Sequence, residues 1–216
     1  MNPSRRRAPR AERLRFDGWI AGTGTASGTR LVVGHWPRSP FGPFTDIMLE
    51  RNDGHRLLLA PTRRTADFIA RTYTFDEVRV MPVRVRVNGT HWTVTAGSLL
   101  ELCLTVGRRN VPGLLLRAVP GALAARTWWT AVTDPVARVL LGVRTRGTAG
   151  GGRREWYGVR DLHRITAVSA RHEGHDLGRL APVEPAVRFG FGSTPSTPCL
   201  VRVTTTVSVP RPADGR

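Results

Sequence analysis

Short runs of alternating apolar and polar residues, separated by turn sequences, recur along these 216 residues. In VRVRVNGTHWTVTA, residues 83–96, a two-residue turn at Asn88-Gly89 pairs Val85 with Trp92 and places both on one face. Successive hairpins of this kind build antiparallel sheets that pack one face on a core. The pattern therefore predicts a largely antiparallel sheet and argues against a series of parallel β-α-β units.

Further strands are expected where other apolar runs are bounded by turn residues. These runs occupy residues 15–36, 44–60, 97–107 and 199–209. Pro61-Thr62 is expected to open a short helix that carries Phe68, Ile69 and Tyr73 on one side, and residues 119–143 form a second helical region.

The expected fold class is therefore α+β and β-rich. We expect a mostly antiparallel, closed β-barrel or cone with two short helical regions. A single domain over residues 14–209 would lie between a flexible basic tail, 1–13, and a frayed C-terminal tail, 210–216.

The formal net charge is +17, and all 33 basic residues are arginines. A basic surface could follow the phosphates of a nucleic acid. However, the complete loss of lysine favours a bias in composition over the whole chain, and no recognition-helix or stacking motif is present. Nucleic acid is therefore the less favoured partner.

Other functional classes find little support. Cys103 and Cys199 are far apart and outside any CxxC motif, so neither a metal site nor a disulfide framework is expected. His172 and His175 could hold a metal, but Glu173-Gly174 between them favours a hairpin turn. No run of about 18 apolar residues occurs, so no membrane span is expected and a cytoplasmic location is the default.

The order of elements resembles the acetoacetate decarboxylase superfamily, including its actinobacterial relatives, over roughly residues 15–209. The resemblance lies in four segments, namely GPFTDIMLE, GHRLLLAPTRRTADFIARTYTF, LLLRAVPGALA and GHDLGRLAPVEPAVRFGF. It implies a closed β-cone around an apolar pocket, in which authentic decarboxylases form an imine between a pocket lysine and a β-keto acid.

The resemblance also implies functional positions. Asp46 falls at the place of a pocket carboxylate, Arg63 matches an arginine, and Phe68 matches an aromatic residue. The lysine pair of the family falls near Ala70-Arg71, within a residue or two, and the chain has no lysine anywhere. Because an imine requires a neutral primary amine and arginine stays protonated, imine chemistry is not expected.

We therefore expect a small-molecule-binding protein, with no catalytic residue, cofactor or metal assigned. Arg63 or Arg71 would bind a ligand carboxylate, Asp46 would orient that arginine, and Glu101 could converge with Asp46. Exposure on the helix or sheet surface is the alternative for Arg63, Arg71 and Glu101, and core packing is the alternative for Phe68 and Tyr73. The predicted ligand-binding residues are Asp46, Arg63, Phe68, Arg71, Tyr73 and Glu101.

Two other functions stay open at this point. One is a lyase, isomerase or cyclase that uses arginine and carboxylate groups on a keto-acid or polyketide-like compound. The other is a basic nucleic-acid-associated protein. One expected partner is a small organic ligand, which could carry a carboxylate group. The other is a further copy of the chain in a homo-oligomer.

Overall fold

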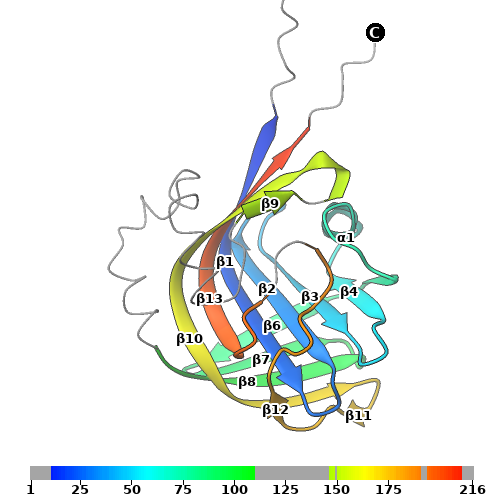
Figure 1. Ribbon diagram of the computed structural model, residues 1–216, viewed down its shortest axis with the longest axis vertical. Helices are drawn as coiled ribbons and strands as arrows, with labels where there is room; N and C mark the ends of the chain where they lie inside the picture. Colours follow the sequence, from blue (N-terminus) through cyan, green and yellow to red (C-terminus); the bar gives the residue numbers. More distant parts are fainter. Residues whose placement is uncertain (1–10, 110–145, 149, 191–193, 211–216) are drawn as a thin grey trace, which may run out of the picture.

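The computed structural model describes residues 11–109, 146–148, 150–190 and 194–210, and these residues form a β-rich fold with one α-helix (Figure 1). Most residues of the two expected tails, 1–13 and 210–216, lie outside these ranges. Within them, no helix has the length and apolar character needed to cross a membrane. The elements are β1 (Glu12–Thr25), β2 (Arg30–Arg38), β3 (Phe44–Glu50), β4 (Arg56–Ala60), α1 (Arg63–Ala70), β5 (Glu77–Val80), β6 (Val83–Asn88), β7 (His91–Ala96), β8 (Leu100–Arg109), β9 (Arg146–Thr148), a 3-10 turn (Gly150–Gly152), β10 (Arg154–His172), β11 (His175–Asp176), β12 (Leu180–Ala181) and β13 (Cys199–Val209).

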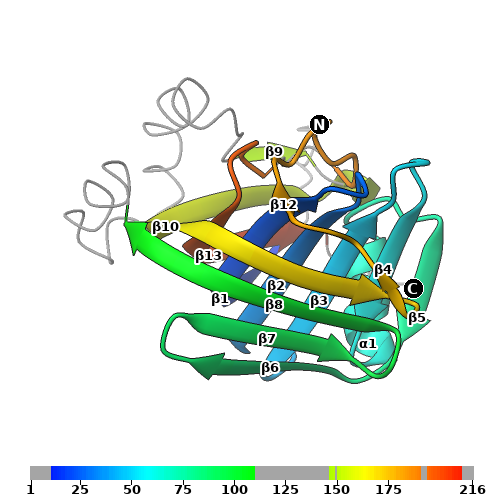
Figure 2. The same cartoon turned by 90° about the horizontal axis from the view of Figure 1, so that it is seen from below.

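All described strands belong to one sheet, whose main path runs β5-β4-β3-β2-β1-β13-β10-β8-β7-β6. The mostly antiparallel arrangement is confirmed, and the exception is β4 with β5, a parallel pair connected through α1. The sheet curls so that β6, β7 and β8 cross the strands β1, β2 and β3 (Figure 2). No ladder among the described strands joins the edge strands β5 and β6, so closure of the barrel stays a prediction.

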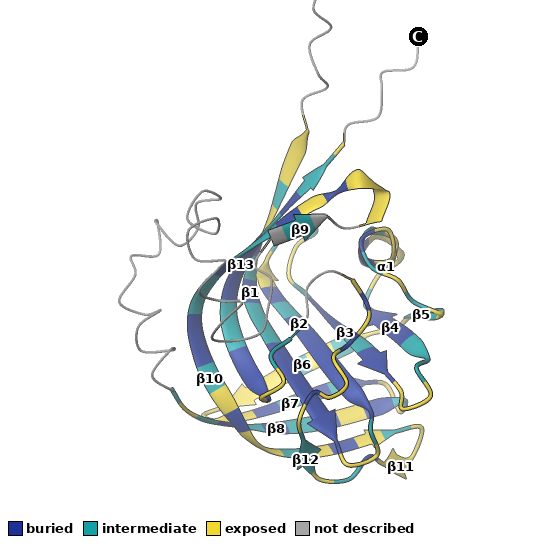
Figure 3. Cartoon of the chain, viewed as in Figure 1, coloured by how far each residue is buried: buried dark blue, intermediate teal, exposed yellow. Residues whose placement is uncertain are grey.

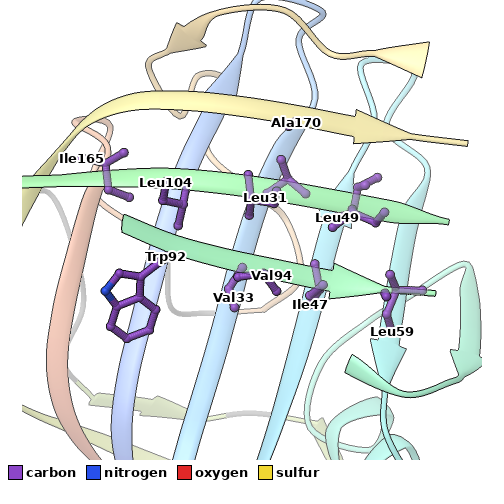
Figure 4. Close-up of a cluster of buried hydrophobic side chains, with 14 of the residues drawn as sticks. Leu31, Val33, Ile47, Leu49, Leu59, Trp92, Val94, Leu104, Ile165 and Ala170 are labelled. Carbon is purple, nitrogen blue, oxygen red and sulfur yellow. The ribbon is translucent and has the colours of Figure 1, made fainter. Parts of the chain in front are cut away.

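The strands β2 and β3 are buried on both faces (Figure 3), which explains why their sequences are apolar without strict alternation. On one face, Leu31, Ile47 and Leu49 form a cluster with Val94 of β7 and Leu104 of β8 (Figure 4). Each fully buried leucine contributes about 1.5–3 kcal/mol. The residues between them on β2 and β3 face the opposite side of the sheet, where a cavity lies.

The hairpin of β6 and β7 is confirmed, but its expected register is wrong. Val85 pairs with Val94, and Trp92 pairs with Val87, so the two-residue turn is Gly89-Thr90. A shift of two residues leaves every side chain on its original face, and alternation alone cannot distinguish the two registers. Gly89 has a φ of 58°, a left-handed conformation that glycine adopts without strain.

The helix α1 begins where the sequence predicts. The Thr62 side chain caps it by accepting a hydrogen bond from the Thr65 backbone N–H, and the Thr65 hydroxyl oxygen accepts one from the Thr62 backbone N–H. Ala66 and Ile69 are buried against the sheet. The second expected helical region, 119–143, lies outside the described residues.

Candidate functional site

A cavity of about 160 Å³ lies on the face of β2 and β3 that is turned away from the Leu31 cluster. Strands β1, β10 and β13, helix α1 and four residues that precede β13, namely Val187, Phe189, Thr194 and Pro195, line it as well. Most of the lining is valine and aromatic side chains, and no arginine occurs among the described residues that line it. The oxygen-bearing side chains in the lining are Asp46, Tyr73, Glu155, Tyr157, Thr194 and Thr205.

Asp46 faces the cavity from β3 together with Phe44 and Met48, because alternate residues of a strand share a face. It is 2% exposed, and its Oδ1 accepts a 2.9 Å hydrogen bond from Nε1 of Trp36 on β2. Burial raises the pKa of Asp46 from 3.8 to about 7, and the bond from Trp36 opposes this rise only in part. The carboxyl group is therefore neutral below about pH 7.

Gly34 provides the room for this hydrogen bond. It pairs with Asp46 across the ladder between β2 and β3. A Cβ atom at this position would lie 2.6 Å from both Asp46 Oδ1 and Trp36 Nε1. The contact between Trp36 and Asp46 therefore requires glycine at position 34.

A second polar group in the cavity is a cluster of one carboxyl and two phenols. Tyr73 Oη donates to Glu155 Oε2 over 2.9 Å, Tyr157 Oη donates to the same oxygen over 3.1 Å, and the two phenol oxygens are 2.7 Å apart. Burial raises the pKa of Glu155 from 4.5 to about 7, while the two tyrosine bonds lower it. Burial also raises the pKa of both tyrosines well above 10, so both phenols stay protonated at neutral pH.

Two further hydroxyl groups in the lining have no hydrogen-bond partner among the described residues, Thr194 Oγ1 and Thr205 Oγ1. Thr205 is 5% exposed and is the direct cross-strand neighbour of Tyr157. A buried hydroxyl without a partner costs about 1–3 kcal/mol. A molecule in the cavity that bonds to these hydroxyls would recover this energy.

The structure brings only half of the six predicted ligand-binding residues to the cavity. Asp46, Phe68 and Tyr73 line it. Arg63 and Arg71 are exposed at the beginning and end of α1 and are absent from the lining. Arg63 precedes Phe68 by five residues, about 140° around a helix, so the two side chains face different sides.

Glu101 is likewise absent from the lining, because it is exposed on β8 while its sequence neighbours turn inward. Of the two alternatives for Glu101, the structure therefore shows exposure on the sheet surface, and the acid that shares the cavity with Asp46 is Glu155 on β10. A sequence signal for Glu155 does exist. In the strand EWYGV it alternates with Tyr157 and Val159, which puts a carboxyl group on an otherwise apolar face.

Arg153 is a buried arginine that contacts the cavity-lining residue Phe68, and the sequence did not single it out. It is 7% exposed, its Nη1 donates to the Phe68 carbonyl oxygen over 2.7 Å, and its guanidinium lies 4.6 Å from the centre of the Phe68 ring. Burial and the charge of Arg71 lower its pKa. Arg153 thus contacts the lining residue Phe68 but is not itself part of the lining.

No group of three or more His, Cys, Asp and Glu side chains in the described part of the chain could hold a metal ion. His172 and His175 are directly paired at the junction of β10 and β11. Glu173 and Gly174 form the turn between them, both with positive φ. Of the two alternatives for this segment, the hairpin turn is therefore confirmed.

No family model matches the chain, and no curated protein matches it. The crystal structure of acetoacetate decarboxylase from Legionella pneumophila aligns with 96% of this chain and 90% of its own, with 10% sequence identity and a TM-score of 0.44. A second acetoacetate decarboxylase structure aligns with 95% of this chain and 88% of its own, with 8% identity and a TM-score of 0.45. These are structures of the family that the sequence resembles, and the likeness is one of fold that assigns no role to any residue.

Proposed function

We propose that this chain binds one small, mostly apolar organic molecule in the cavity. The observation that carries the proposal is a space of about 160 Å³ with apolar walls, two buried acids and two hydroxyls that have no partner among the described residues. A cavity of about 150 Å³ in a protein core holds a molecule the size of benzene. A single six-membered ring with one polar substituent therefore matches the available volume.

We further propose that the ligand is held without an imine. The 216 residues contain no lysine, and an arginine cannot act as a neutral amine nucleophile. The groups that face the cavity are carboxyls, phenols and aliphatic hydroxyls, which bind through hydrogen bonds.

The lining does not favour the carboxylate-bearing ligand that the sequence suggested. That suggestion depended on Arg63 or Arg71, and both are exposed. Asp46 and Glu155 would repel a second negative charge in a poorly solvated space. A neutral or cationic polar group is therefore the better match.

The test is a titration with cyclohexanol, a six-membered ring with one hydroxyl group. The Trp36 indole N–H donates to Asp46 at the cavity wall, so its resonance in nitrogen-15-labelled protein reports on the site. Comparison with the Trp36→Phe variant assigns this resonance. We expect a saturable shift of the Trp36 signal at ligand concentrations up to about 10 mM.

The matched control uses the same substitution inside and outside the cavity. Val32 lines the cavity, whereas Val87 is 54% exposed on the edge strand β6. Val32→Phe should weaken binding about tenfold or more by filling the space, and Val87→Phe should leave it unchanged. The double variant Arg63→Ala, Arg71→Ala should also bind normally. An unmoved Trp36 signal, or full binding by a folded Val32→Phe variant, contradicts the proposal.

Acid–base catalysis is a second candidate, and the pKa values of Asp46 and Glu155 favour it. Both acids have a pKa of about 7 and line one cavity, and a pKa near the working pH suits a group that accepts and donates protons. The lyase, isomerase or cyclase suggested by the sequence would thus use carboxyls and phenols in place of arginines. Deuterium uptake from heavy water at the carbon next to the carbonyl of cyclohexanone, lost in Asp46→Asn, would support this candidate.

A further inference from the structure

Asp46 is a buried carboxyl group that has no counter-charge among the described residues, in a chain that is rich in cations. The sequence has 33 basic residues and a formal net charge of +17. Glu50 is fully buried beside Arg30 at 2.8 Å, and Asp161 is 9% exposed beside Arg109 at 2.9 Å. No comparable ion pair to Asp46 occurs within the described residues, where its side-chain partner is the neutral indole of Trp36.

A buried carboxyl of this kind is ionised only when something offsets its desolvation. The isolated charge costs several kcal/mol to bury, so the group takes up a proton or pairs with a cation. For Asp46, burial favours the proton, as its raised pKa indicates. A ligand that brings its own positive charge would replace that proton.

The rest of the cavity also suits a cation. Glu155 is a second buried acid in the lining, and the rings of Phe16, Trp36 and Phe68 form part of the wall. Aromatic ring faces attract cations. The Phe68 ring already contacts the Arg153 guanidinium, so the rings left for a ligand are those of Phe16 and Trp36.

The unpartnered Thr205 hydroxyl is an independent sign that a ligand belongs here. It is buried, it lines the same cavity, and it has no hydrogen-bond partner in the described part of the chain. A hydroxyl oxygen accepts hydrogen bonds, so it can receive an N–H group as well as donate.

We infer that the ligand is an organic ammonium ion, whose apolar part fills the cavity and whose N–H groups donate to Asp46. This inference rests on the proposed function, because it specifies the polar group of the molecule that the cavity binds. A hydrogen bond from an ammonium to a carboxylate is charge-assisted and stronger than one between neutral groups. The match to the site is thus one of charge as well as of volume.

The test compares two ligands of nearly the same shape that differ in charge, cyclohexylammonium and cyclohexanol. Both are titrated at about pH 8, where Asp46 and Glu155 ionise readily and the amine remains protonated. We expect cyclohexylammonium to bind about tenfold more tightly than cyclohexanol. Asp46→Asn should remove most of that difference, because the ammonium then loses its charged partner.

The control for Asp46→Asn is Asp53→Asn, the same change at an exposed acid in the turn between β3 and β4. It should bind both ligands as the unmodified chain does. If Asp46→Asn does not fold, the unmodified chain at about pH 5.5 replaces it, because both cavity acids are then protonated while the ligand keeps its charge. The preference for the ammonium should disappear under that condition.

The outcomes separate this inference from the proposed function. Equal binding of the two ligands, or tighter binding of cyclohexanol, overturns the ammonium inference and leaves the cavity as a binding site. Undiminished ammonium binding by folded Asp46→Asn also overturns it, because the cation would then be held elsewhere. If neither ligand binds, both proposals are wrong.

Discussion

Replacing Asp46 by asparagine should stabilise the protein at pH 8 more than at pH 5. Asparagine has nearly the shape of a protonated aspartic acid, and its side-chain oxygen can still accept the bond from Trp36. Because Asp46 is fully buried and its pKa rises from 3.8 to about 7, the folded state holds a proton there that the unfolded chain releases above about pH 4. Stability should therefore fall as the pH rises from about 4 to about 7.

The expected size follows from the pKa values. At about 1.4 kcal/mol per pKa unit, the interval from 3.8 to about 7 corresponds to a total cost of about 4 kcal/mol at pH 8. Of this total cost, about 3 kcal/mol arises between pH 5 and about pH 7. The gain in unfolding free energy from Asp46→Asn should thus be about 3 kcal/mol larger at pH 8 than at pH 5. The titration of Glu155 changes the unfolding free energy of both proteins in the same direction. Its contribution therefore cancels from the difference between them to first order.

The assay is urea unfolding of both proteins at the two pH values. The control is Asp76→Asn, because the pKa of Asp76 is lowered in the folded protein whereas that of Asp46 is raised. Hydrogen bonds from Arg56 hold the pKa of Asp76 below its usual value, so Asp76 contributes stability that is present above about pH 4 and lost in acid. Asp76→Asn should therefore destabilise at both pH 5 and pH 8. An equal effect of Asp46→Asn at the two pH values would refute the argument that burial destabilises its charged form.

Two further substitutions test the packing around the site. Gly34→Ala should cost about 1–3 kcal/mol in urea unfolding and shift the Trp36 indole resonance, because the added methyl would lie 2.6 Å from Asp46 Oδ1; an unshifted resonance would contradict the close approach. Leu102→Ala, in the cluster between the crossing strands, should cost about 2–5 kcal/mol, whereas Val87→Ala on the exposed edge should stay within about 0.5 kcal/mol. Similar losses at positions 102 and 87 would show that the cluster is not a packed core.

Most of the strand pattern could be predicted from local signals. Residues 199–209 alternate along β13, and Pro61-Thr62 marks the beginning of α1, because period and capping depend on near neighbours in the chain. The register of β6 with β7 could not be predicted in the same way. Registers that differ by two residues place the same side chains on the same face, so the decision lies with the turn and with contacts to β8.

The six predicted ligand-binding residues divide evenly between the cavity and the surface. Asp46 and Phe68 were identified from the family resemblance and Tyr73 from its own segment, and all three line the cavity. Arg63, Arg71 and Glu101 carry the right chemistry, yet each is exposed.

The alternation of apolar and polar residues was enough to establish a β-rich, mostly antiparallel chain, since each strand carries its own period of two. The absence of lysine was likewise enough to argue against an imine. The location of Asp46 and the Glu155 cluster in one cavity could not be read from the chain. The two residues lie on β3 and β10, which are separated by three strands in the sheet, and the curl of the sheet brings them to one cavity. Burial in that shared space raises the pKa of both acids, and burial depends on the packing of the whole sheet.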